Sequence, residues 1–142
     1  MTFRFFDHTA DLGIELEAPT RDGLFAEAAA AFCAALTEPS RVEERDTRAL
    51  ELAEADDGLL LVAFLNELLF WFEQGWICRS ATAALHSDDR SLSALRLEAR
   101  ISGEPYDPER HPVKVLLKAA TYHGLEIDRA PGGYRARVVI DL

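Results

Sequence analysis

Lysine is nearly absent from this sequence: Lys114 and Lys118 are the only two lysines among 15 basic residues. Acidic residues number 25, which gives a formal net charge of −10. A chain with so few clustered cations lacks the basic surface that binding by phosphate neutralisation requires, so we expect any contact with nucleic acid to be at most indirect. The acidic balance instead suits solubility, a bound cation or a basic protein partner.

Cysteine is equally scarce. Cys33 and Cys78 form neither a CxxC nor a CxxH spacing, so a structural zinc site is not expected. The sequence alone leaves open whether these two cysteines form a disulfide. The start of the chain lacks the basic region and uninterrupted apolar run of an export signal. We therefore expect reduced thiols and a cytoplasmic location. An apolar stretch in mid-chain is broken by Asn66, Glu67 and Glu73 and falls short of the roughly 20 residues of a membrane span.

Hydrophobic residues are abundant and occupy 49% of the 142 positions. That is enough for a real core in a single domain covering residues 1–142. Apolar spacing predicts two helices, over residues 20–37 with Thr20 as N-cap and over residues 56–74 with Gly75 as the C-terminal cap. Strands are expected at residues 3–6, 12–17, 50–52, 76–85, 92–101, 113–127 and 134–142. Six or seven strands with two helices, and no βαβ repeat, predict an α+β fold with a mainly antiparallel sheet.

The sequence also makes predictions about the loops and turns between these elements and about a bend in one strand. Residues 102–112 (SGEPYDPERHP) are expected to form an ordered, proline-punctuated loop. We expect His111 in that loop, and His86 in a turn, to be solvated. The strand predicted over residues 113–127 is expected to bend at Gly124.

The stretch DHTAD near the start places two carboxylates and an imidazole, Asp7, His8 and Asp11, between two predicted strands. At the other end Asp141 stands beside the terminal carboxylate of Leu142. If the last strand paired with an N-terminal strand, Asp11, Asp141 and that carboxylate would converge, and such oxygen donors suit a hard cation such as Ca²⁺ or Mg²⁺. From the residues alone the plainer interpretation is favoured, with Asp7 capping a turn, Asp11 solvated and Asp141 a charged end.

Histidine and lysine offer further candidates. His8 and His123 could transfer a proton or bind a ligand, although a single histidine beside a strand is more often a hydrogen-bonded structural residue. No Ser-His-Asp or Cys-His arrangement can be assigned. Lys114 and Lys118 would face the same way in an extended strand, where a lysine can meet a phosphate or a carboxylate. Two solvated lysines on an exposed sheet face are the plainer interpretation.

The motifs DHTAD, LNELLF, GEPYD, KAATYH and the final IDL occur in an order that resembles the archease family from Phe6 to Leu142. Each motif is weak alone, but the ordered combination is specific. The resemblance implies a divalent cation held by Asp11, Asp141 and Leu142. It also matches the functionally important lysine of the family to Lys118. We expect supporting roles for Asp7, His8 and His123.

The resemblance also implies a function. Archeases are accessory proteins of the RtcB-type RNA ligase, which joins RNA ends carrying a 3′-phosphate or 2′,3′-cyclic phosphate to a 5′-hydroxyl through a guanylylated histidine of its own. The accessory protein promotes that guanylylation and repeated turnover in tRNA splicing and RNA repair, and is not itself an enzyme. Two alternatives stay open. One is a stand-alone metal-dependent phosphohydrolase or nucleotide-binding enzyme, and the other is a chaperone-like scaffold with a structural metal.

Overall fold

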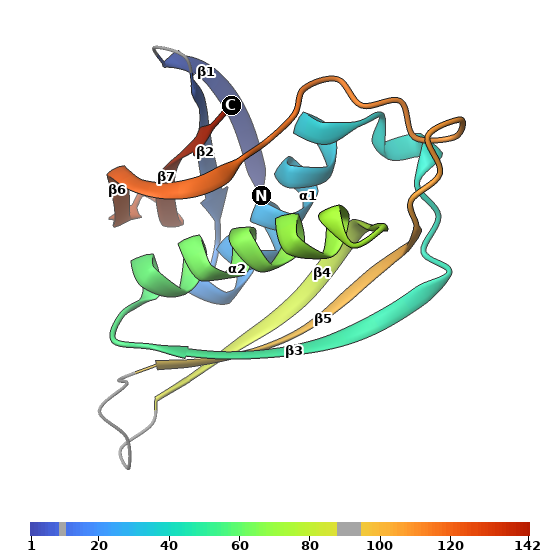
Figure 1. Ribbon diagram of the computed structural model, residues 1–142. Coiled ribbons are helices and arrows are strands. Elements are labelled where there is room, and N and C mark those ends of the chain that lie inside the picture. Colours follow the sequence, from blue (N-terminus) through green and yellow to red (C-terminus); the bar gives the residue numbers. More distant parts are fainter. Residues whose placement is uncertain (9–10, 88–94) are drawn as a thin grey trace.

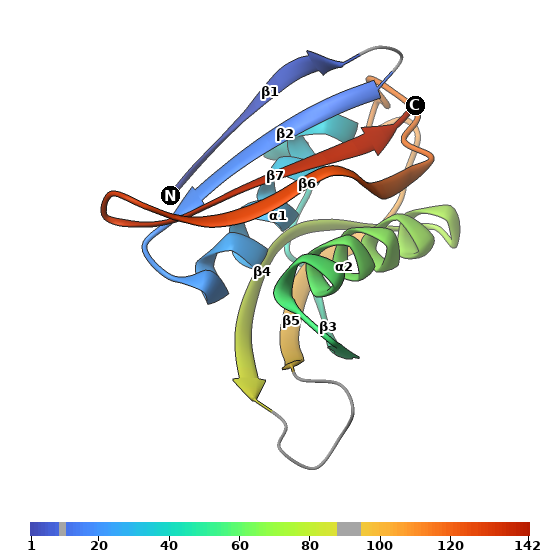
Figure 2. The same cartoon turned by 90° about the vertical axis from the view of Figure 1, so that its left-hand side faces the viewer.

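The computed structural model describes residues 1–8, 11–87 and 95–142, with the backbone alone at residues 7 and 8. Within these ranges two α-helices lie between two antiparallel sheets (Figures 1 and 2). One sheet has the strand order β1-β2-β7-β6 and the other the order β3-β5-β4. The strands are β1 Thr2–His8, β2 Asp11–Ala18, β3 Asp46–Glu54, β4 Trp76–Ser87, β5 Leu95–Pro105, β6 Ala119–Ala130 and β7 Gly133–Asp141. The predicted α+β, antiparallel fold is confirmed.

Both helices begin and end where the sequence indicates. In α1, Arg21–Leu36, the hydroxyl of Thr20 accepts a hydrogen bond of 3.0 Å from a backbone N–H of the first turn. In α2, Asp57–Glu73, the carboxylate of Asp56 accepts a similar bond of 2.9 Å. Each cap satisfies an N–H group that has no partner inside the helix. Gly75, with φ of +95°, follows α2 in the left-handed conformation that ends many helices.

The division into two sheets differs from the single sheet that the sequence predicts, and the helices explain it. In α1 the buried side chains surround the helix instead of forming one stripe: Leu24, Phe25, Glu27, Ala28, Ala29, Ala31, Phe32, Cys33, Ala35 and Leu36. A helix that is apolar on all sides needs partners on all sides. One sheet therefore covers α1 through β2, and the other covers it through β4 (Figure 1).

None of the helices in the described ranges is long and apolar enough to cross a membrane.

The two cysteines are buried and unpaired, as predicted. Cys33 on α1 and Cys78 on β4 are both free thiols. Burial raises the pKa of the Cys33 thiol to about 11 and that of Cys78 well above its ordinary value. Because the thiolate is the reactive form, these groups are unreactive packing residues at neutral pH.

The strand predicted over residues 113–127 is wrong in its first part. β6 begins only at Ala119, and residues 113–118, here called the strap, form an irregular connection over the surface (Figure 1). The predicted bend at Gly124 is confirmed, since this residue has φ of +67° and the register with β7 is irregular around it.

Hydrogen bonds to two different elements explain the path of the strap. The backbone N–H of Lys114 donates to the carbonyl of Leu36 at the end of α1, at 2.9 Å. The backbone N–H of Lys118 donates to the carbonyl of Asp141 in β7, also at 2.9 Å. Between them the side chain of Leu117 is buried. The two lysines therefore do not share one strand face, contrary to the prediction.

Two further boundaries differ from the sequence-based expectation. β5 continues through Pro105, so residues 102–105 belong to a strand and only the rest of the predicted loop is irregular. His86 lies in β4, not in a turn, and its Nε2 is 3.4 Å from a carboxylate oxygen of Glu98. Most of the predicted turn falls in residues 88–94, outside the described residues.

Candidate functional site

One end of the four-stranded sheet brings the beginning and the end of the chain together. The register pairs His8 with Asp11, Asp11 with Asp141, and Asp141 with Ala119, so these four positions form a row across β1, β2, β7 and β6. Figure 2 shows the end of β7 beside the start of β2. Directly opposed residues of antiparallel strands have Cβ atoms about 4.5–5.5 Å apart on the same face. The register of β2 with β7 confirms the predicted pairing of the last strand with an N-terminal strand.

The two aspartates occupy the face of this sheet that points away from the helices. Ile14 and Leu16 of β2 and Val138 of β7 point inward and are fully buried, and Asp11 and Asp141 alternate with them. The outer face is open to solvent at Asp141. Two carboxylates held side by side repel each other, and a cation between them removes that repulsion.

Lys118 is brought to this row by its backbone. Its N–H bond to the carbonyl of Asp141 places the α-carbon of Lys118 next to the end of β7. Within the described residues the ammonium group of Lys118 makes no hydrogen bond or ion pair. Lys114, in contrast, donates to the carbonyl of Ala34 at 3.2 Å and lies 3.7 Å from the carboxylate of Glu38. Among the contacts that the structure describes, Lys118 is therefore the lysine whose charge is not engaged by another group.

The remaining predicted residues are placed as follows. Leu142 directly follows Asp141 and is exposed. Asp7 and His8 lie in β1, but their side chains are outside the described part of the structure. His123 lies on an exposed stretch of β6 where pairing with β7 is irregular, and the register does not set it opposite Asp11.

No group of three or more His, Cys, Asp or Glu side chains within the described ranges is arranged to hold a metal ion. A cation at the row would thus need main-chain oxygen in addition to the two carboxylates.

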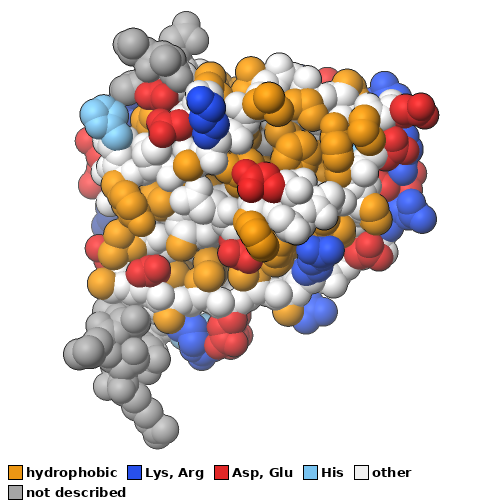
Figure 3. All heavy atoms as spheres, in the orientation of Figure 1, with side chains coloured by type: hydrophobic (Ala, Val, Ile, Leu, Met, Phe, Trp, Pro, Cys, Tyr) orange, Lys and Arg blue, Asp and Glu red, His pale blue; other side chains and the backbone are white. Residues whose placement is uncertain are grey.

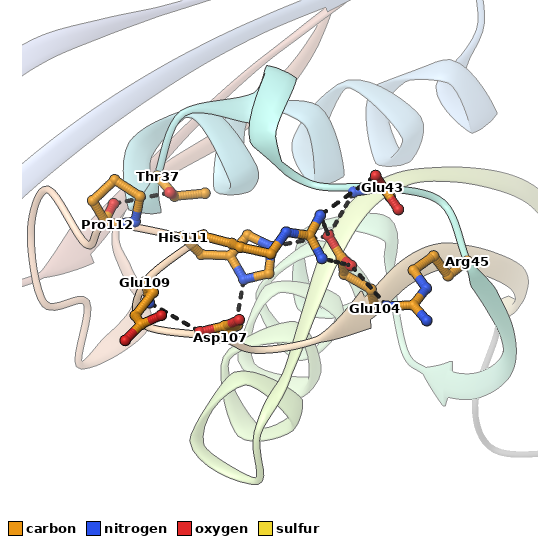
Figure 4. Close-up of polar contacts among 9 residues, drawn as sticks. Thr37, Glu43, Arg45, Glu104, Asp107, Glu109, His111 and Pro112 are labelled. Atoms are coloured by element: carbon orange, nitrogen blue, oxygen red, sulfur yellow. Dashed lines mark hydrogen bonds and ion pairs between the residues drawn. The ribbon is translucent and has the colours of Figure 1, made fainter.

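A second polar cluster, which the sequence reasoning missed, lies at the end of β5 (Figure 4). Glu104 is fully buried and accepts two hydrogen bonds from the guanidinium of Arg110, at 2.9 and 3.1 Å. It also accepts the backbone N–H of Glu43 at 2.7 Å and contacts Nε2 of His111 at 2.9 Å. The guanidinium of Arg45 lies 3.7 Å away.

His111 is 0% exposed, so the expectation that it is solvated is wrong. Its Nδ1 accepts the backbone N–H of Asp107 at 2.9 Å, which leaves the ring proton on Nε2, where it is donated to Glu104. Both ring nitrogens are used, and the ring also stacks on Tyr106 with centroids 5.9 Å apart. The residue is buried because the loop folds back onto the carboxylate.

The charge of Glu104 is held in place by its donors. Burial works to raise the pKa of this carboxyl group, but the hydrogen bonds from the Glu43 N–H, His111 and Arg110 outweigh it and lower the pKa from 4.5 to about 2. The carboxylate therefore stays ionised throughout the physiological range.

This cluster fixes the start of the strap. It ties residues 106–111 to β5, and the hydroxyl of Thr37 then donates to the carbonyl of Pro112 at 2.8 Å. An arginine and a histidine six and seven residues after Glu104 were the only signal in the sequence. Because the sequence predicts an ordered loop with a solvated His111, nothing in it indicates that the loop closes on the glutamate.

Comparison with known proteins agrees with this fold. The sequence profile of the archease protein family (MTH1598/TM1083) matches residues 3–142. The archease of Methanosarcina mazei is 31% identical over 142 residues, covering 99% of this chain and 95% of that protein. The archease of Methanopyrus kandleri is 33% identical and covers both chains completely.

Two solved structures are similar to this chain as well. The solution structure of Methanobacterium thermoautotrophicum protein 1598 superimposes with a TM-score of 0.77 at 32% identity, covering 99% of this chain and 98% of that one. A crystal structure from Thermotoga maritima, described as an archease and possible chaperone, has a TM-score of 0.61 at 15% identity, covering 96% and 94%. The chain belongs to the archease family.

Proposed function

We propose that this protein activates an RtcB-type RNA ligase by promoting GTP-dependent guanylylation of the ligase. The activating site would consist of a divalent cation held by Asp11, Asp141 and a main-chain oxygen of Leu142, with Lys118 beside it. The observation that carries the proposal is the register of β2 and β7, which pairs Asp11 with Asp141.

The donor set fits a hard cation. Carboxylate and main-chain oxygens are the ligands that Ca²⁺ and Mg²⁺ prefer, and water can complete the coordination at an exposed sheet end. When bound, such a cation neutralises charge on phosphate oxygens as pyrophosphate leaves. Asp11 and Asp141 would hold it in a fixed position, because both lie on paired strands.

Lys118 would act alongside this pair. Its backbone N–H is bonded to the carbonyl of Asp141, while its ammonium group makes no hydrogen bond or ion pair within the described part of the chain. A lysine offers a compact charge on a flexible stem, which suits the orientation of a triphosphate oxygen. Lys114 is already engaged with α1 and would not take this role.

The charge of the chain supports this choice of partner. A ligase that binds GTP and RNA ends needs a basic active site, and a chain with net charge −10 is complementary to it. We infer that the acidic end of the four-stranded sheet approaches the entrance to that site. The description of the Thermotoga relative as a possible chaperone is compatible with action on a partner protein.

Single-turnover guanylylation of the ligase, with GTP and a divalent metal, tests the proposal. We expect the wild-type protein to raise the rate, and Asp11→Ala and Asp141→Ala to lose this effect while keeping their circular dichroism spectra and melting temperatures. A parallel reaction without ligase measures hydrolysis of nucleotides and phosphoesters. Turnover there would favour the phosphohydrolase, and stimulation that follows only the folded fraction of each variant would favour the scaffold.

A further inference from the structure

Large hydrophobic side chains are exposed on the segments next in sequence to the Lys118–Asp141 hydrogen bond. Among the described residues, seven large hydrophobic side chains are exposed, and four of them belong to the strap, the start of β6 or the residue after β7. These four, here called the apolar rim, are Val115, Leu116, Tyr122 and Leu142. Figure 3 shows hydrophobic side chains gathered on the face that carries the strap and α2. Single exposed hydrophobic residues are ordinary, but a group beside a polar site indicates an interaction surface.

The strap presents its part of the rim in a fixed position. Leu116 is 72% exposed, the highest value among the large hydrophobic residues that the structure describes, whereas the next residue, Leu117, is 7% exposed. Hydrogen bonds hold the strap at Lys114 and at Lys118, on either side of Val115 and Leu116. Because the strap is already ordered, it loses little conformational entropy when a partner covers these side chains.

The apolar rim adjoins charged groups whose attraction to phosphate and metal is stronger when water is excluded. Lys118 is two residues from Leu116, and Asp141 immediately precedes Leu142. Interfaces commonly surround their energetically important groups with contacts that keep water out. Attraction between charges grows as the local dielectric constant falls, so a sealed site would strengthen the contacts of Lys118 and the carboxylates with phosphate and metal.

We propose that the apolar rim docks onto the surface of the RtcB-type ligase around its guanylylation site and closes the candidate cation site against solvent. The inference rests on the proposed function and adds the surface through which it is exerted. Charge argues for this occupant: the strap is bonded to Asp141, which pairs with Asp11, on a chain of net charge −10 that complements a basic protein surface. A second copy of this chain would bring like charges together, and an anionic lipid surface would repel it.

The test separates binding from activation. The affinity for the ligase is measured by titration of a fluorescently labelled protein, and the guanylylation rate is then measured at saturating protein. We expect Leu116→Ser to weaken binding about tenfold or more, the loss typical of one well-buried leucine. At saturation the guanylylation rate of the same variant should rise towards that of the wild type, because the other three rim residues still cover the site. Tyr122→Ser is expected to weaken binding as well.

Phe5→Ser is the matched control, since Phe5 is 39% exposed on β1, at the opposite edge of the four-stranded sheet from β6. It should bind like the wild type. Wild-type affinity of Leu116→Ser, or equal losses in Leu116→Ser and Phe5→Ser, would overturn the apolar rim as the docking surface while leaving the proposed function intact. Failure of the wild-type protein itself to bind and stimulate the ligase would overturn both. A melting temperature near that of the wild type shows that each variant is folded.

Discussion

Asn66 of α2 and Ala120 of β6 exchange two hydrogen bonds. The backbone N–H of Ala120 donates to Oδ1 of Asn66 at 2.7 Å, and the amide nitrogen of Asn66 donates to the carbonyl of Ala120 at 3.2 Å. The side-chain amide thus pairs with the strand as a neighbouring strand would, at the edge of β6 that β7 does not cover. Ala120 is two residues from Lys118, so this contact helps to position the candidate site.

Asn66→Ala should lower the free energy of unfolding by about 1–3 kcal/mol, because it leaves two backbone groups of Ala120 without partners. It should also reduce ligase stimulation at a temperature where the variant is fully folded. Urea denaturation and guanylylation rates measure the two effects. Thr20→Ala removes the cap of α1 at a cost of about 1 kcal/mol and is the control for stability alone. Equal stimulation by both variants would show that Asn66 only stabilises the fold.

The buried carboxylate of Glu104 should make stability depend on pH in the acid range. Its pKa is about 2 in the folded protein, below the ordinary 4.5, so the unfolded chain takes up this proton first as the pH falls. The stabilisation is present in full above about pH 4.5 and is lost as the pH falls towards 2. Urea unfolding of the wild type and of Glu104→Gln, from pH 7 to pH 3, measures it.

At pH 7 Glu104→Gln should cost roughly 3 kcal/mol, near the lower end for a broken buried pair. The loss of stability is expected near the lower end of that range because Arg110, left without its carboxylate partner, is 38% exposed, so water can hydrate its charge. The difference between the two proteins should shrink below pH 4.5. A difference that stays constant down to pH 3 would contradict the ionised, hydrogen-bonded state of Glu104.

Gly103 has no room for a side chain. A Cβ atom there would overlap the carbonyl oxygen of Ile77 and lie 2.9 Å from Cα of Cys78, where β5 passes the irregular pairing of β4. Both atoms are backbone, so the strands would have to separate. We expect Gly103→Ala to cost more than Gly124→Ala, whose site is open and whose positive φ alone costs about 1 kcal/mol. Thermal denaturation of both variants ranks them, and the reverse order would contradict the close approach.

Cation binding should depend on the aspartate pair and not on acidity in general. We expect isothermal titration with Ca²⁺ and with Mg²⁺ to detect one site in the wild type and none in Asp141→Asn. Asp128→Asn is the matched control, since Asp128 is an exposed aspartate of the same sheet opposite Arg135. It removes one charge and should leave binding unchanged. Equal weakening in both variants would indicate a diffuse charge effect and no site.

Much of the fold was predictable because its signals are local. The caps at Thr20 and Asp56, the left-handed Gly75 and the alternation from Leu12 to Leu16 each specify their own element. The residues alone predict the pairing of Asp11 with Asp141 only on the condition that the last strand meets an N-terminal one, because no local pattern determines which strands become neighbours. The family resemblance, not the periodicity, made that pairing the preferred one.

The errors share a physical cause. Val113 to Lys118 looked like a strand because apolar residues follow one another, yet the backbone there bonds to α1 and β7 and forms no ladder. His111 looked solvated because it lies among prolines and charges, yet Glu104 draws it inside. In both cases contacts between distant segments override the local pattern, and no single sequence records them.

The most direct test of the central claim is a double-mutant cycle on ligase guanylylation with Asp11→Asn, Asp141→Asn and the double variant. If the two carboxylates act together on one cation, each single substitution should remove most of the stimulation and the double variant should be no worse. Asp128→Asn should stimulate like the wild type. Full stimulation by either single variant, or losses in the two single variants that simply add in the double variant, would contradict an activating site shared by Asp11 and Asp141.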